Sequence, residues 1–246
     1  VLLLMLLPFT GLLIELLRKR PLIAVATLER YCWISFGFVF IFFSLSGTQL
    51  PHYLLYGFTP LLLLLGTQMD RLQSKIWALA PALILPILFS LLPELLNYGA
   101  TRMDNAHQQA MLSAATDSAG LSYRVLSIGG AVATAWLIFL NRSALWQRLV
   151  VAGLIQALVL AWAVLPLLAE IQQQPIKDAA TIATKKSAPL VLWKAHLPSF
   201  VTYTKRAVER RAPKSGDIVL TRLQHQSKLP AYTVLFNSNG IVLAEM

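Results

Sequence analysis

The residues best suited to chemistry lie in a short polar segment between two strongly apolar stretches. Gln49, His52 and Tyr53 flank Pro51, and each has a side chain that can hydrogen-bond a polar ligand. A polar turn broken by proline is tolerated at membrane depth only where protein or a water-filled cavity surrounds it. The segment therefore predicts a site for a polar ligand. The alternative is an ordinary loop whose His and Tyr belong to the aromatic belt at the membrane surface.

Arg102 and Arg124 are a second pair of candidates, near the predicted ends of apolar segments. A guanidinium holds two oxygens of a phosphate at once, so an arginine at the bilayer surface suits a lipid-linked phosphate. The alternative is that each arginine anchors the chain among lipid headgroups. The acidic residues that we place on the outer side of the membrane, as the arginines are, form no closely spaced pair. We therefore assign no catalytic residue to this chain. These acids are Glu94, Asp104, Asp117 and Glu170.

The sequence carries no signature of a soluble enzyme or of a metal site. It contains no Walker loop, GxSxG, HExxH or Cys/His metal spacing. Cys32 is the only cysteine, which excludes an intrachain disulfide and a cysteine-based metal site. We therefore identify no metal ligands and no cofactor.

Membrane-spanning helices must position these candidates. Hydrophobic residues make up 57% of the 246 residues and charged residues 13%, against about 25% charged in soluble domains. A bilayer core needs about 20 apolar residues per helix. We predict an α-helical polytopic membrane protein of about six transmembrane helices with a small C-terminal α+β soluble domain. The predicted spans are residues 1–17, 32–46, 51–66, 76–96, 123–140 and 149–169.

The distribution of basic residues predicts the orientation of the chain. Eight Lys and Arg flank the spans on one side, and two, Arg102 and Arg124, lie in the opposite short connections. By the positive-inside rule the first set is cytoplasmic. We therefore expect an inner (plasma) membrane protein in which residues 46–51, the loop 97–122 and the C-terminal tail face the periplasm or exterior. Residues 103–115 in that loop are predicted to form an interfacial helix.

The composition changes after Glu170. We divide the chain into a transmembrane domain (1–170), a polar linker or juxtamembrane helix (171–188) and a small α+β domain (189–246). Strands are predicted at 189–194 and 216–223, a helix at 197–207, and a final hairpin around Asn239-Gly240. Residues 171–246 hold eleven Lys and Arg against four Asp and Glu. An outward domain of this charge suits anionic lipid rather than nucleic acid, although a solvated face is the simpler explanation.

Residues 42–66, FFSLSGTQLPHYLLYGFTPLLLLLG, resemble a stretch of the polyprenyl-phosphate-dependent membrane glycosyltransferases. This superfamily includes the protein O-mannosyltransferases and the lipid A aminoarabinose transferases. The resemblance rests on Leu50-Pro51-His52-Tyr53-Leu54-Leu55, Pro60 and Gly66, and LPSFVTY (197–203) resembles a segment near the start of the family's outward domain. Two positions depart from the family pattern: Gln49 replaces the usual Lys, and Tyr56 replaces the usual Pro.

The resemblance implies transfer of a sugar from a polyprenyl-phosphate carrier to a lipid, glycan or protein acceptor on the outer side. It places the catalytic carboxylate in the family's N-terminal half. In the family, basic groups, or in some members a divalent metal, stabilise the leaving phosphate. Because this chain begins inside an apolar run, we expect the C-terminal part of a longer protein, inactive without that half. Two other classes remain open: a transporter or polysaccharide export component, and an accessory protein whose basic domain binds anionic glycolipid.

Overall fold

The computed structural model describes residues 9–19, 27–45, 55–67, 75–140 and 143–246. The chain divides into two compact units, one of residues 1–90 and 127–159 and one of residues 91–126 and 160–246. One boundary lies at the bend between two helices, at Ser90 and Leu91, and the other two fall within continuous helical runs, so each unit combines segments that are distant in the sequence. The division at residues 170 and 189, which follows composition, stays a prediction.

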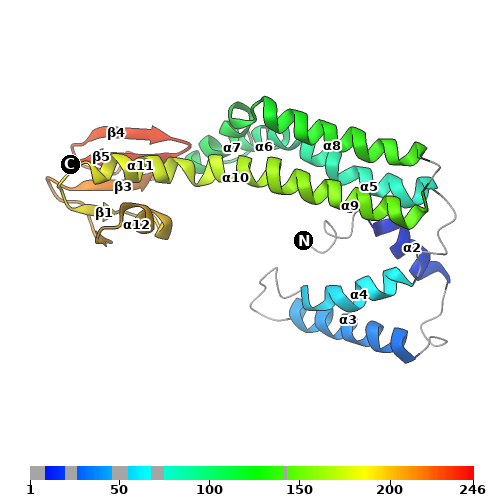
Figure 1. Ribbon diagram of the computed structural model, residues 1–246. Helices are drawn as coiled ribbons and strands as arrows, with labels where there is room; N and C mark the ends of the chain where they lie inside the picture. Colours follow the sequence, from blue (N-terminus) through cyan, green and yellow to red (C-terminus); the bar gives the residue numbers. More distant parts are fainter. Residues whose placement is uncertain (1–8, 20–26, 46–54, 68–74, 141–142) are drawn as a thin grey trace. The chain divides into compact units, whose positions relative to one another are not determined.

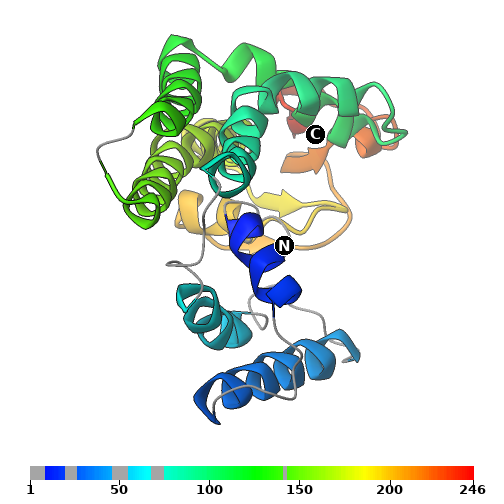
Figure 2. The same ribbon diagram turned by 90° about the vertical axis from the view of Figure 1, so that its right-hand side faces the viewer.

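The first unit is a set of apolar helices packed around leucines. Its helices are α2 (Thr10–Lys19), α3 (Thr27–Leu45), α4 (Leu55–Gly66), α5 (Lys75–Ser90), α9 (Leu145–Val159) and most of α8 (Leu121–Phe139). Helices α3 and α4 lie side by side, and α5 packs on α9 (Figures 1 and 2). Buried Leu12, Leu61, Leu79 and Leu149 belong to one cluster, which ties four of these helices together.

Two buried polar side chains complete helix hydrogen bonding in this unit. Pro86 lies inside α5 and has no N–H to donate to the carbonyl of Ala82, four residues earlier. The side chain of Gln156 on α9 donates to that carbonyl at 2.7 Å. Arg148 is also buried and donates to the carbonyls of Ser143 and Leu137, the latter in the last turn of α8. Both residues therefore supply donors that the helices themselves lack.

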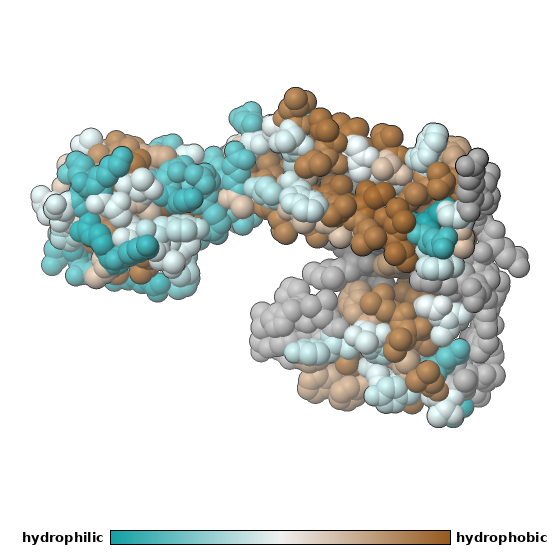
Figure 3. Space-filling view, viewed as in Figure 1, coloured by the Kyte–Doolittle hydropathy of each residue, from teal (hydrophilic) through white to brown (hydrophobic). Residues whose placement is uncertain are grey.

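The membrane class predicted from composition agrees with the helices. Among the described residues, three helical segments are long and apolar enough to cross a membrane: α3, α8 and the continuous run Leu145–Gln172, of 19, 19 and 28 residues. The number is four if the bent pair Ala78–Ser90 and Leu92–Ala100 forms one crossing. Hydrophobic residues cover these helices on the face shown in Figure 3. The count of six spans stays a prediction.

The long run Leu145–Gln172 is not a uniform helix. A π-helical turn, η4 (Leu160–Val164), separates α9 from α10 (Leu165–Gln172). Pro166 lies at the start of α10, and its missing N–H interrupts the regular hydrogen-bond ladder at this point. The predicted span 149–169 is thus confirmed as helical and extended at both ends.

Besides η4, α10 and the short α13 (Leu223–Gln226), four helices of the second unit surround or precede the C-terminal sheet. They are α6 (Leu92–Ala100), α7 (Ala106–Ser118), α11 (Gln174–Thr184) and α12 (Pro198–Thr204). Helix α7 matches the helix predicted at 103–115 and packs on α6. Asn105 begins it, because its side-chain oxygen accepts from the backbone N–H groups of His107 and Gln108.

A five-stranded mixed sheet forms the C-terminal region, in the order β2-β1-β3-β5-β4. Its strands are β1 (Leu190–Leu192), β2 (Val208–Glu209), β3 (Ile218–Arg222), β4 (Thr233–Ser238) and β5 (Ile241–Glu245). Strands β1, β2 and β3 are parallel, whereas β5 runs antiparallel to β3 and β4. Asn239 and Gly240 have φ of 46° and 77°, which confirms the predicted hairpin turn.

Helix α11 covers one face of this sheet (Figure 1). Its buried Ile176, Ala179 and Ala183 share a core with Leu190 and Phe200. Alanine lets the helix approach the strands closely. Of the two alternatives for residues 171–188, polar linker or helix, the structure therefore shows a helix over most of the range, and the helix belongs to the core of the sheet.

Candidate functional site

The helices on both sides of the Gln49, His52 and Tyr53 segment pack against each other. These three residues lie outside the described residues, so their candidacy stays a prediction. Helix α3 ends at Leu45 and α4 begins at Leu55. The approach is close at Gly57, where an added Cβ would lie 3.2 Å from a methyl of Val39. The segment 46–54 therefore joins two helices that are in direct contact.

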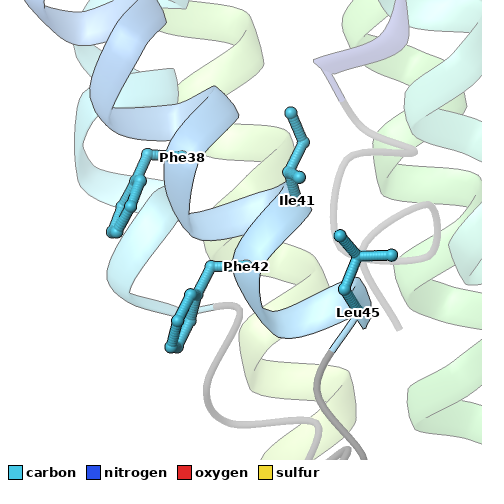
Figure 4. A pocket seen from close by; sticks show the side chains of 4 residues that line it. All are labelled: Phe38, Ile41, Phe42 and Leu45. Carbon is cyan, nitrogen blue, oxygen red and sulfur yellow. The ribbon is translucent and has the colours of Figure 1, made fainter.

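The C-terminal half of α3 carries a shallow apolar hollow of about 440 Å³. Its lining residues are Phe38, Ile41, Phe42 and Leu45, which are all exposed (Figure 4). Phe38 and Phe42 stack on each other with ring centroids 5.6 Å apart. A hollow of this chemistry suits hydrocarbon, and its four described lining residues carry no group that could take part in a reaction.

Arg124, at the start of α8, forms an ion pair with Glu94 on α6 at 2.8 Å. Their side chains are 42% and 45% exposed, so the pair contributes little to stability. Its consequence is electrostatic. Because Glu94 balances the charge of Arg124, Arg124 is a weaker candidate for binding a lipid-linked phosphate.

Arg102 lies just beyond the end of α6, and its guanidinium covers the ring of Tyr98 at 4.8 Å. One of its N–H groups donates to the Tyr98 hydroxyl. The planar guanidinium has five N–H donors in all, so several remain for a ligand. No carboxylate of the described residues pairs with Arg102 in a salt bridge.

Arg102 and Arg124 each contact a side chain of α6. Glu94 and Tyr98 lie four residues apart, on successive turns of α6, and Arg102 follows at the same interval just beyond the end of the helix. We call Glu94, Tyr98, Arg102 and Arg124 the α6 cluster. Each predicted arginine has its own contact on α6, Arg124 with Glu94 and Arg102 with Tyr98. The sequence analysis assigned neither contact residue to the site. Their four-residue spacing to Arg102 is the signal that could have identified them.

Six of the basic residues of the C-terminal region come as adjacent pairs, Lys185-Lys186, Lys205-Arg206 and Arg210-Arg211. In each pair one member is bonded inside the domain and the other is exposed. The bonded members are Lys186 with Glu245, Arg206 with the Ala188 carbonyl, and Arg211 with Asp217, each at 2.9 Å. The exposed members are Lys185, Lys205 and Arg210. Half of these charges therefore have a structural role, which weakens the idea of a surface dedicated to anionic lipid.

A metal site is not apparent in the part of the chain that the structure describes. No group of three or more His, Cys, Asp or Glu side chains there is close enough to hold an ion.

Comparison with known proteins identifies a similar fold in solved structures. No protein-family model matches the sequence, and no curated protein matches it. Two crystal structures of ArnT from Cupriavidus metallidurans match, one in the apo state and one bound to undecaprenyl phosphate, at 17% and 18% identity. Both give a TM-score of 0.66 and cover 99% of this chain and 51% of the solved chain. The chain thus spans about half the length of these structures, and over nearly all of its own length its fold is similar to that of ArnT.

Proposed function

We propose that the chain is the C-terminal part of a membrane glycosyltransferase that takes a sugar from a polyprenyl-phosphate carrier. The acceptor is a lipid, glycan or protein on the outer side of the membrane. The observation that carries the proposal is the ArnT-like fold over 99% of the chain, since one matching structure holds undecaprenyl phosphate. The sequence resemblance at residues 42–66 supports it from an independent direction.

In the proposed reaction an acceptor oxygen attacks the anomeric carbon of the sugar. The bond from that carbon to the carrier phosphate breaks, and the acceptor proton passes to a base outside this chain. The phosphate leaves with increased negative charge, which cationic donors stabilise. Arg102 is the better of the two arginines for this role, because Arg124 is paired with Glu94.

The chain's own contribution is to position the carrier. Gln49, His52 and Tyr53 would hydrogen-bond the polar end of the carrier at membrane depth, and Gln49 would do so without charge. The apolar hollow on α3 ends at Leu45, four residues before Gln49. Prenyl chains are hydrocarbon and suit such a surface. This arrangement requires the 46–54 segment and the C-terminal sheet to face the outer side.

The test is sugar transfer by the complete protein that contains this chain, in membranes supplied with a radiolabelled polyprenyl-phosphate sugar. Replacing His52 by Ala or Tyr53 by Phe is expected to lower transfer by at least about tenfold, since each removes one hydrogen bond to a charged group. Arg102→Gln should act in the same direction, and Arg124→Gln less.

The matched control is Arg210→Gln, which removes one exposed charge from the C-terminal region and should leave transfer unchanged. Expression and membrane insertion of every variant are measured alongside. Full activity in the His52, Tyr53 and Arg102 variants would reduce the 42–66 segment and the α6 cluster to structural elements. If the intact protein transfers none of several polyprenyl-linked sugars, the proposed function itself is contradicted.

A further inference from the structure

A polar cavity of about 350 Å³ lies in the second unit, and no residue of the α6 cluster is among its lining residues. It forms where the start of α7, the junction of α10 and α11, and the β4–β5 turn come together. Polar side chains of these segments and of the end of β3 line it, among them Gln108, Gln172, Gln173, Arg222 and Asn239. Its volume falls within the range of small-molecule sites, which begins at about 300 Å³.

Arg222, the last residue of β3, supplies the charge of this cavity. It is the one charged residue among the described residues that line it. Its side chain has no hydrogen-bond or ion-pair partner among the described residues, and its Nε is buried and unsatisfied. Arg222 as a whole is partly exposed, but a buried N–H donor without an acceptor is unfavourable, and proteins rarely leave one so unless a ligand or water completes it.

His107 supplies a hydrogen-bond acceptor in the same wall. The carbonyl of Gly240 accepts from the backbone N–H of Leu223 and from Nδ1 of His107, both at 2.9 Å. Because a carbonyl only accepts, Nδ1 must carry the proton. Burial, reinforced by the charge of Arg222, lowers the pKa of His107. In the neutral ring Nε2 is then an acceptor, suited to a ligand hydroxyl.

We propose that this cavity binds a phosphate-bearing group with neighbouring hydroxyls. The guanidinium of Arg222 pairs with the phosphate in the fork geometry that suits its oxygens. The amides of Gln108, Gln172 and Gln173 and the ring of His107 hydrogen-bond the hydroxyls. A sugar phosphate or a phosphatidylglycerol headgroup offers this chemistry. The site is independent of the α6 cluster, so its occupancy does not require sugar transfer.

The first arm of the test uses a soluble probe. The full chain in detergent micelles is titrated with glucose 1-phosphate, with glucose as the uncharged control, and binding is followed by the shift in thermal midpoint. Saturable binding of glucose 1-phosphate is expected in the wild type. Arg222→Gln should weaken it at least about tenfold, because a charge-assisted pair is lost. Arg210→Gln, of equal charge change, should bind as the wild type does.

The second arm places the full chain in phosphatidylcholine nanodiscs with or without phosphatidylglycerol. Stabilisation by phosphatidylglycerol that Arg222→Gln removes and Arg210→Gln retains identifies the membrane as the source of the ligand. Binding in the soluble arm alone identifies a soluble sugar phosphate. Either result supports the site, and the difference between the arms assigns its ligand.

Equal binding by wild type and Arg222→Gln, or no binding in both arms, overturns the proposal. Should Arg222→Gln fail to fold, Arg222→Lys keeps the charge but lacks the Nε–H and the planar fork. Its affinity for glucose 1-phosphate should be reduced, and unchanged affinity would equally overturn the proposal. Neither outcome bears on glycosyl transfer, which is measured separately.

Discussion

Gln156 illustrates how a single polar residue in an apolar helix can be explained by a proline on its neighbour. The residue donates to the Ala82 carbonyl, which Pro86 leaves without its helical partner. In the core of a lipid bilayer there is no water from which an unsatisfied carbonyl could accept a hydrogen bond. The pair therefore acts as a unit: the proline is tolerated because the glutamine is present.

We expect Gln156→Leu to lower the free energy of unfolding by about 0.5–2 kcal/mol, the range for interhelical hydrogen bonds in membranes. Denaturant titration of the chain in micelles measures it. Pro86→Ala restores the missing N–H, so Gln156→Leu should cost markedly less in that background. An equal cost in both backgrounds would contradict the explanation.

At the scale of elements, the β4–β5 turn is fitted closely to α7. Gly240 has φ of 77°, and a Cβ there would lie 2.5 Å from Nδ1 of His107. Two constraints thus act at one glycine: the turn requires a left-handed backbone, and α7 leaves no room for a side chain. This contact joins residues 133 positions apart in the chain.

Gly240→Ala is expected to destabilise the second unit by more than the backbone cost alone. Gly216→Ala is the matched control, since Gly216 has φ of 86° with nothing within 4 Å of an added Cβ. The free energy of unfolding should fall by about 1–2 kcal/mol in the control, and it should fall clearly further in Gly240→Ala. Thermal unfolding compares them, and limited proteolysis near residue 105 reports loss of the α7 contact. Equal losses would show that α7 is not tightly docked.

These elements differ in how far the sequence predicts them. The hairpin at Asn239-Gly240 follows from local turn chemistry, and the helix predicted at 103–115 follows from the helix-forming residues of that segment. The structure confirms the turn and has the helix at Ala106–Ser118. The packing of α11 does not follow, because its buried face is mostly alanine and reads as a polar linker. The ion pair of Arg124 with Glu94 and the cavity around Arg222 join distant segments, and no local pattern specifies such contacts.

For the molecule as a whole, two histidines make stability depend on pH. The pKa of His107 is lowered by burial and by Arg222, and that of His225 by burial and by Lys194, Lys228 and Arg222. Both lie in a chain of formal net charge +10. Each histidine therefore resists protonation in the folded state more than in the unfolded state.

Lowering the pH from 7.5 to 5.5 is expected to reduce the thermal midpoint of the chain. The sign follows because the unfolded state binds more protons once the pH falls below about 6.5, the ordinary histidine value. The loss of stability grows as the pH falls, until it reaches the lowered pKa values that the two histidines have in the folded state. His107→Gln combined with His225→Gln should flatten the dependence in this window. A double variant with the same pH profile as the wild type would assign the effect to other groups.

The strand order β2-β1-β3-β5-β4 has a consequence for biosynthesis. Of the five strands, β5 is synthesised last, yet it lies between β3 and β4. Until β5 is made, both of its neighbours have an unpaired edge, the kind of surface on which chains aggregate. The sheet therefore cannot form before β5 is synthesised, whereas the apolar helices, which precede all five strands in the sequence, can form earlier.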